Sequence, residues 1–199
     1  MSDIEVKPVQ TPVSMQRYAD ACRAAWIPEL GGDAPYLSVA VLWGQYMVET
    51  GGSACWNWNI GNVKRVVGDG NPFHVLGGNK ENGVVVGRGA SMFRAFPDLA
   101  TAMRLHLRFL YSGRYAKAWN CVIAFAPEDC ARELYDAGYY TGGPGNREED
   151  IKPYAAGMRY HFTDFTRKIP VWSVPEEDRI VTVRDLSDVV SGADKVRSS

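Results

Sequence analysis

The chain has 199 residues, 46% of them hydrophobic, which is enough for one domain with a sizeable core. Its net charge of -1 gives no electrostatic basis for binding nucleic acid or an anionic membrane. No run of about 18 apolar residues is present, so no membrane span is expected. The four cysteines and three histidines lack the spacing of metal ligands, so we expect neither a metal nor another cofactor.

The first 13 residues are expected to be an extended, poorly ordered lead-in, because they contain Pro8 and Pro12 and no hydrophobic periodicity. They also lack the basic and apolar regions of a secretory signal peptide. Ser14 is a candidate N-cap for a helix over residues 15–26, which carries an apolar stripe. Pro28, followed closely by two glycines, predicts a break after this helix.

The central element is a helix that begins near Pro35. Glu49 falls seven residues after Leu42, which is about 20° short of two full turns at ~100° per residue. Its carboxylate is therefore predicted to lie on the apolar stripe of the helix. Gly51 and Gly52 then end the helix, because glycine readily takes the left-handed conformation that closes a last turn. The stripe itself consists of Val39, Leu42, Trp43, Tyr46 and Met47.

An acid on an apolar stripe has unusual chemistry. Burial against apolar side chains raises the pKa of a carboxyl group, and a general acid that works near neutral pH needs this property. A glutamate at a helix C-terminus is otherwise most often solvated or paired with a lysine or arginine. Here the loop that follows is rich in aromatic and asparagine residues, at Trp56, Asn57, Trp58 and Asn59. Glu49 is therefore the candidate catalytic residue.

Residues 63–93 predict a small β-region. Short apolar runs at 66–67, 73–76 and 84–86 are separated by turns rich in Gly and Asn. A β-region inserted between helices would form the second lobe of a cleft, where binding sites are common. The region contains two acids. Asp69, between two glycines, is typical of a turn residue, whereas Glu81 is either a functional acid or a solvated one.

Four further helices are predicted after the β-region. Asp98 is a candidate N-cap for the first of them, and His106 on its apolar face is interpreted as a core histidine with satisfied hydrogen bonds. Pro127 opens the third helix. Residues 142–153 are rich in Gly, Pro and charge and are interpreted as a loop, with Pro153 as the start of the last helix. The four predicted ranges are 99–111, 115–126, 127–137 and 153–165.

Three motifs resemble one known family. The string ETGGSACWNWNIGNVK, which begins at Glu49, resembles the E-(S/T)-G-W-G…N-x-(F/L)-G-I-K signature of the bacterial and phage endo-β-N-acetylglucosaminidases of glycoside hydrolase family 73. FRAF at 93–96 matches the family's F-R-x-Y/F motif. AGYYT at 137–141 matches A-G-Y-A-T, with Tyr140 where Ala is usual. The insertion at 142–153 departs from the pattern, and the resemblance ends near Phe165.

The resemblance implies the fold class and the domain organisation. The fold is expected to be α+β and mainly α, a lysozyme-like helical domain whose small inserted β-region forms the second lobe of a cleft. This glucosaminidase domain would span residues 14–165, after the extended segment 1–13. Residues 166–199 would form a C-terminal extension, in which the runs 171–174 and 180–183 alternate like edge strands.

The resemblance also implies roles for particular residues. Glu49 would be the general acid, and Glu81, rather than Asp69, the second acid. Tyr139 would line the cleft, where it would position the N-acetyl sugar or stabilise its developing positive charge. The alternative is a tyrosine packed under a loop, with its hydroxyl hydrogen-bonded to the backbone. The predicted substrate-binding residues offer flat apolar faces for sugar rings or belong to the Asn-x-Gly segment of the signature, namely Trp56, Trp58, Asn59 and Tyr140.

The expected function is a peptidoglycan hydrolase that cuts the glycan strand between N-acetylglucosamine and N-acetylmuramic acid. A separation of roughly 6.5–9.5 Å between the carboxyl groups of Glu49 and Glu81 would permit an inverting mechanism. A larger separation would leave the N-acetyl group of the substrate as nucleophile. The alternatives are a muramidase or a lytic transglycosylase with the same Glu49, or a non-catalytic peptidoglycan-binding module of a virion or injection system.

The expected partner is the peptidoglycan glycan strand. An enzyme that acts on the cell wall without a signal peptide would need delivery by a phage particle, a lysis system or an injection apparatus. The N- or C-terminal segment would then contact proteins of that apparatus.

Overall fold

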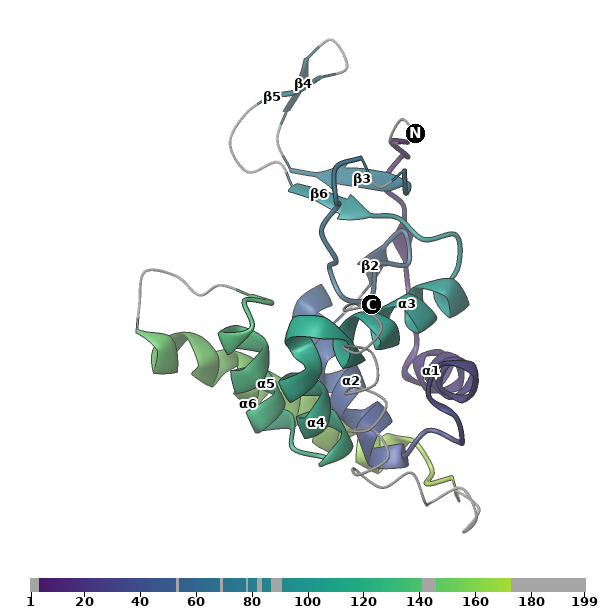
Figure 1. The fold of residues 1–199 in the computed structure, drawn as a ribbon, viewed down its shortest axis with the longest axis vertical. Helices are drawn as coiled ribbons and strands as arrows, with labels where there is room; N and C mark the ends of the chain where they lie inside the picture. The colour runs from purple at the N-terminus through teal and green to yellow at the C-terminus, as the bar shows by residue number, and fades with distance from the viewer. Residues whose placement is uncertain are drawn as a thin grey trace, which may run out of the picture.

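The computed structural model describes residues 4–52, 54–68, 70–77, 79–81, 84–86, 91–140 and 146–172, without the side chains of 79–81 and 84–86. The helices pack into one body, and small two-stranded sheets extend from one end of it (Figure 1). This confirms the expected mainly helical α+β class. None of the described helices is long and apolar enough to cross a membrane. The helices are α1 (Met15–Leu30), α2 (Tyr36–Thr50), α3 (Leu99–Tyr111), η1 (Gly113–Tyr115), α4 (Ala116–Ile123), α5 (Pro127–Asp136) and α6 (Arg147–Lys168).

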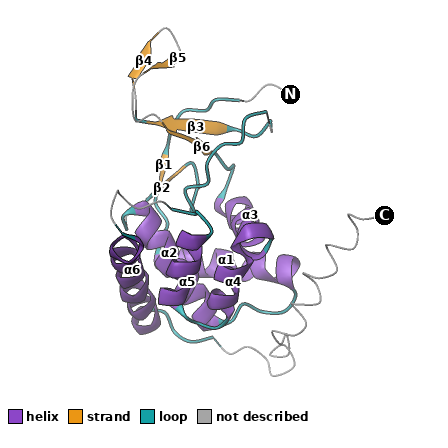
Figure 2. Cartoon of the chain, turned by 60° about the vertical axis from the view of Figure 1, so that its left-hand side comes forward, coloured by secondary structure: helices purple, strands orange, loops and turns teal. Residues whose placement is uncertain are grey.

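Helix α2 lies at the centre of the body, between α1 and α6 (Figure 2). Val39, Val41 and Leu42 are all fully buried, so α2 is apolar on more than the single face that the sequence predicted. Such a helix is stable only when others cover it on several sides. It ends as expected, with Gly51 in the left-handed conformation at φ 64°.

Two glycines allow α2 and α6 to approach closely. A Cβ atom added at Gly44 of α2 would lie 2.7 Å from the backbone oxygen of Met158 on α6. A Cβ atom added at Gly157 of α6 would lie 2.8 Å from Cγ2 of Val48 on α2. Because neither glycine carries a side chain, the two helices come close enough for residues of α6 to reach the end of α2.

A charged cluster joins α1 to α3. The side chain of Glu29 is only 2% exposed and accepts hydrogen bonds from Nε of Arg104 at 2.9 Å and from Nη2 of Arg108 at 2.8 Å. Glu29 belongs to α1 because, of the two predicted break signals, Pro28 does not end the helix and only the glycines after it do. Pro28 lies inside the last turn, and the helix continues to Leu30, where the N–H of Gly31 donates to the carbonyl of Ile27.

Helix α6 also differs from the prediction. It begins at Arg147, six residues before Pro153, so part of the segment interpreted as a loop is helical. The side chain of Asn146 caps it by accepting from the N–H of Glu149 at 3.0 Å. Three consecutive acids in the first turn lie at the positive end of the helix dipole and stabilise this start, and Pro153 lies inside the helix.

Three antiparallel strand pairs form the β-region: β1 (Gln10–Thr11) with β2 (Cys55–Trp56), β3 (Phe73–Leu76) with β6 (Ser91–Arg94), and β4 (Asn79–Glu81) with β5 (Val84–Val86). The β4–β5 pair lies beyond β3 and β6, on the side away from the helices (Figure 1). Of the predicted strands, 73–76 and 84–86 are confirmed. The prediction for 66–67 was wrong, because these residues are exposed and have no strand partner among the described residues.

Residues 4–13, the described part of the N-terminal segment, are extended, as expected, but they are tied to the rest of the fold by hydrogen bonds. Their backbone bonds to two parts of the β-region: the N–H of Val6 donates to the carbonyl of Phe73 at 2.8 Å, and the N–H of Asn57 donates to the carbonyl of Val9 at 2.8 Å. The side chain of Asn57 closes the same contact by accepting from the N–H of Val9. These hydrogen bonds satisfy backbone N–H and C=O groups that an isolated extended segment would leave unpaired within the protein.

The described part of the C-terminal extension packs against the helical body. Ile169 is buried, and Nε1 of Trp172 donates to the carbonyl of Ala34 at 2.9 Å. The ring of Trp172 also contacts Tyr36 edge to face. Residues 171–172 are not in a strand, and the rest of the two predicted edge strands lies outside the described residues.

We expect Gly44→Ala to lower the free energy of unfolding by about 1–3 kcal/mol, because its Cβ would meet backbone that cannot turn aside. The steric cost would be larger than the ~1 kcal/mol by which alanine stabilises a helix relative to glycine, so the net effect is a loss of stability. Gly157→Ala is the matched control, since its Cβ would meet only a side-chain methyl group of Val48. Urea unfolding should show a much smaller loss for the control, and equal stability of Gly44→Ala and the unsubstituted protein would contradict the assigned contact.

Candidate active site

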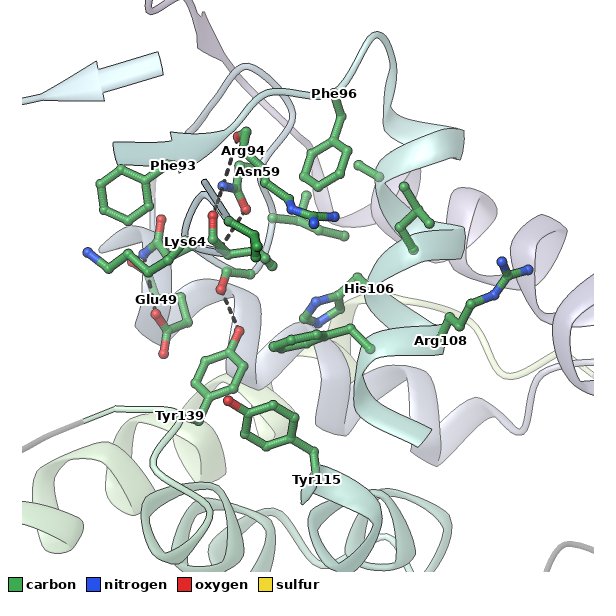
Figure 3. Close-up of a pocket in the computed structure, with 18 of the residues that line it drawn as sticks. Glu49, Asn59, Lys64, Phe93, Arg94, Phe96, His106, Arg108, Tyr115 and Tyr139 are labelled. Carbon is green, nitrogen blue, oxygen red and sulfur yellow. Dashed lines mark hydrogen bonds between the residues drawn. The ribbon is translucent and has the colours of Figure 1, made fainter. Parts of the chain in front are cut away.

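A cleft of about 620 Å³ runs between the helical body and the loop that follows α2. Glu49 lies on its wall, at the end of α2, and Figure 3 shows Tyr139, Tyr115 and His106 on the helical side. The described lining residues are Glu49, Asn59, Ile60, Gly61, Asn62, Val63, Lys64, Arg65, Val66, Phe93, Arg94, Phe96, Ala102, Leu105, His106, Arg108, Phe109, Ser112, Arg114, Tyr115, Gly138 and Tyr139.

The carboxyl group of Glu49 is held between two elements. Its Oε1 accepts a hydrogen bond from the hydroxyl of Tyr154 on α6 at 2.6 Å, and its Oε2 accepts from Nδ2 of Asn62 at 3.3 Å. Desolvation raises the pKa of this carboxyl above its ordinary value of 4.5, and this outweighs the opposing effects of Tyr154, Asn62 and the charge of Lys64. The acid is therefore oriented on both oxygens and binds its proton more tightly than an exposed glutamate.

The loop that carries Asn62 is shaped by left-handed backbone conformations. Asn57, Trp58 and Asn62 have φ values of 48°, 57° and 48°. Asparagine tolerates this region better than most residues, which explains the Asn-rich sequence. The side chain of Asn59 fixes the next turn, because its amide nitrogen donates to the carbonyls of Val63 at 2.9 Å and Arg94 at 3.0 Å. The predicted site residue Asn59 thus lines the cleft, but its amide nitrogen bonds to the protein backbone.

Tyr139 lines the same cleft as Glu49. Its hydroxyl donates a hydrogen bond to the backbone carbonyl of Gly61 at 2.5 Å, as in the alternative interpretation of this residue, and its ring packs on Tyr115 with centroids 5.4 Å apart. The hydrogen bond ties the segment after α5 to the loop after α2 (Figure 3).

His106 departs from its interpretation as a satisfied core histidine. It is 3% exposed, as a core residue would be, but it lines the cleft and its Nδ1 has no hydrogen-bond partner among the described residues. The helical periodicity of residues 99–111 placed it on the apolar face. The sequence offered no signal that this face ends at a cleft.

The other predicted sugar-binding aromatics do not line the cleft. Trp56 is half-buried in β2, and Trp58 packs against the guanidinium of Arg17, 4.6 Å from its ring centroid. Tyr140 stacks on Tyr154, with centroids 3.9 Å apart and ring planes at 4°. Tyr140 therefore supports the ring whose hydroxyl bonds to Glu49, a contact that the sequence did not predict for either tyrosine.

Tyr154 is a residue of the site that the sequence analysis missed. It lies on the apolar face of the last helix and is 9% exposed. Hydrophobic periodicity predicts burial but not the direction of the hydroxyl, which reaches Glu49 across 105 residues of chain.

The second acid stays a prediction. Glu81 is the last residue of β4, but its side chain is outside the described part of the structure, as is Asp69. Within the described residues, no group of three or more His, Cys, Asp or Glu side chains is placed to hold a metal ion.

No protein-family model matches the sequence, and no curated protein matches it either. Among solved structures, it is similar to the C-terminally truncated glycoside hydrolase domain of FlgJ from Salmonella typhimurium, with a TM-score of 0.51 and 19% identity over 78% of this chain and 97% of that chain. A mutant peptidoglycan hydrolase from Sphingomonas sp. A1 aligns with a TM-score of 0.49 and 20% identity over 77% of this chain and 99% of that chain. The likeness to the FlgJ domain shows a shared fold, and it confirms the expected lysozyme-like one.

We expect Tyr154→Phe to raise the pKa of Glu49 further, because it removes a donor that stabilises the ionised carboxylate. The pKa can be read from the side-chain carboxyl carbon in an NMR titration. Tyr135→Phe is the matched control, since the Tyr135 hydroxyl bonds to Asp150 instead. An unchanged or lower pKa in Tyr154→Phe would contradict the assigned hydrogen bond.

The raised pKa of Glu49 also predicts a pH-dependent stability. A carboxyl whose folded pKa lies above the unfolded value of 4.5 stabilises the fold fully below that value, and this contribution is lost as pH rises through the folded pKa. Glu49→Gln cannot ionise, so its melting temperature should rise relative to that of the unsubstituted protein as the pH is raised above about 4.5. Calorimetry at several pH values measures this difference, and a fall in the relative melting temperature of Glu49→Gln with rising pH would show the opposite sign of shift.

Proposed function

We propose that this chain is a peptidoglycan hydrolase that cleaves the glycan strand with Glu49 as general acid. One observation carries the proposal: a desolvated carboxyl with a raised pKa lies on the wall of an open cleft, held on both oxygens by Tyr154 and Asn62. Glycoside hydrolysis needs a proton on the leaving oxygen, and an acid that is oriented and reluctant to ionise supplies it near neutral pH. The glycoside hydrolase fold is consistent with this chemistry.

Tyr139 would act on the positive charge that develops at the sugar. Its hydroxyl proton is directed to the carbonyl of Gly61, which leaves lone pairs of the oxygen available to an electron-poor centre. An oxocarbenium-like transition state has such a centre. Tyr139 and Glu49 would then divide the work, the acid protonating the leaving group and the phenol oxygen stabilising the sugar that remains.

Two routes complete the reaction. In an inverting reaction Glu81 would activate a water molecule from the other lobe of the cleft. In a substrate-assisted reaction the N-acetyl group of the substrate would attack instead, and no second carboxylate would be needed. Both routes use Glu49 in the same role.

The bond that we propose is the one after N-acetylglucosamine, because the motif beginning at Glu49 resembles that of endo-β-N-acetylglucosaminidases. A muramidase or lytic transglycosylase would use the same acid on the neighbouring bond. A non-catalytic wall-binding module would retain the cleft without needing the acid, and the raised pKa of Glu49 favours the enzyme over this module.

We expect Glu49→Gln to lower the rate of wall digestion by about 10²–10⁴-fold, which is the usual contribution of a positioned general acid. Purified peptidoglycan is digested, and the soluble fragments are identified by mass spectrometry. Glu148→Gln is the matched control, because Glu148 is an exposed acid of α6 whose side chain is 61% exposed. The control should keep full activity.

The fragments also separate the alternatives. Reducing N-acetylglucosamine ends support the proposal, reducing muramic acid ends indicate a muramidase, and 1,6-anhydro ends indicate a transglycosylase. Wall binding without soluble fragments would identify a non-catalytic module. Near-normal digestion by Glu49→Gln would remove Glu49 from the mechanism.

A further inference from the structure

The cleft is lined by a buried imidazole, that of His106, which the proposed mechanism does not use. Helix α3 contributes Ala102, Leu105, His106, Arg108 and Phe109 to the cleft. The guanidinium of Arg108 is bonded to Glu29, and Ala102, Leu105 and Phe109 are apolar. A ligand that enters beside these apolar residues meets the imidazole among them.

The His106 ring is neutral, and its Nδ1 makes no hydrogen bond to a described residue. Burial lowers the pKa of His106 to about 4, so the ring is neutral near pH 7. Its Nδ1 is sealed from solvent and has no hydrogen-bond partner among the described residues. Leaving a buried N–H donor unsatisfied is costly, so the neutral ring is expected to carry its one proton on the other nitrogen, Nε2.

The packing around the ring decides which nitrogen can reach a ligand. A Cβ atom at Gly61 would lie 2.5 Å from both Cε1 and Nδ1 of His106, so this edge of the ring faces the Gly61 backbone. Nε2, unlike Nδ1, is not one of the buried side-chain atoms that lack a hydrogen-bond partner. A neutral imidazole carries one proton, and placing it on Nε2 gives an accessible donor and leaves Nδ1 as an acceptor against a C–H group.

We propose that His106 binds the 2-acetamido group of a substrate sugar, with Nε2–H donating to the acetyl carbonyl and the methyl group packing against Leu105 and Phe109. An acetamido group joins one acceptor to one methyl group, and this matches a single donor in an apolar wall. A sugar hydroxyl would leave Leu105 and Phe109 without an apolar contact. A carboxylate would be attracted to the lysine and arginines elsewhere in the cleft, but at the neutral ring it would gain no charge attraction and would lose water against Leu105 and Phe109. The inference rests on the proposed function, because it assigns the sugar that the same cleft holds beside Glu49.

Binding to the Glu49→Gln protein tests the proposal without turnover. Calorimetry compares chitotriose with cellotriose, which carries a hydroxyl in place of each acetamido group and has the same zero charge. Chitotriose should bind at least about tenfold more tightly, as expected for one hydrogen bond and a buried methyl group. Adding His106→Phe should bring the ratio close to one, and His106→Gln, which can still donate, should restore part of it.

His161→Phe is the matched control for this substitution. Nδ1 of His161 is also buried without a partner among the described residues, but His161 lies on α6 and does not line the cleft. It should leave the ratio unchanged. Equal binding of the two sugars to the Glu49→Gln protein, no binding of either, or a ratio that His106→Phe leaves intact would overturn the proposal.

A second measurement needs no substitution at His106. The chain has only three histidines, so their ring nitrogens can be resolved by NMR. The His106 signals should report an Nε2–H tautomer and shift with chitotriose but not with cellotriose. An Nδ1–H tautomer or unmoved signals would overturn the proposal. Failure of the proposed function would appear differently, as absent wall digestion by the unsubstituted protein.

Discussion

The close approach of α2 and α6 is the constraint on which the site depends. Two glycines, Gly44 and Gly157, let the helices meet almost backbone to backbone. The hydroxyl of Tyr154 can therefore reach the carboxyl of Glu49, and the stacked ring of Tyr140 holds Tyr154 in place. Burial in this packing also removes water from around Glu49, and the desolvation raises its pKa by more than the Tyr154 hydrogen bond lowers it.

The loop after α2 provides the other half of the site. Its left-handed residues turn the chain sharply enough for Asn62 to reach Glu49 and for Gly61 to lie against both Tyr139 and His106. Strain and desolvation at these positions lower the stability of the fold, as is common where a protein prepares a reactive or binding group. The central helix α2, buried on several sides, supplies the stability that offsets this cost.

Much of the fold could be predicted because its signals are local. Ser14 and Asp98 cap their helices as expected, Pro127 opens α5, and Gly51 ends α2. The predictions that were wrong involve competition between local signals and their surroundings. Proline was expected to interrupt α1 and to start α6, yet both helices include their proline, because capping and packing on either side outweigh one missing hydrogen bond.

The position of Glu49 on an apolar stripe followed from the sequence alone, since helical spacing determines which residues share a face. The expectation that Glu49 is a general acid, and that Tyr139 lines the same cleft, followed from short motifs. Tertiary structure alone decided that Tyr154 bonds to Glu49, that His106 lines a cleft, and that Trp56 and Trp58 do not. Hydrophobic periodicity predicts which side chains are buried. It does not predict which distant element packs against them, or where a cleft reaches them.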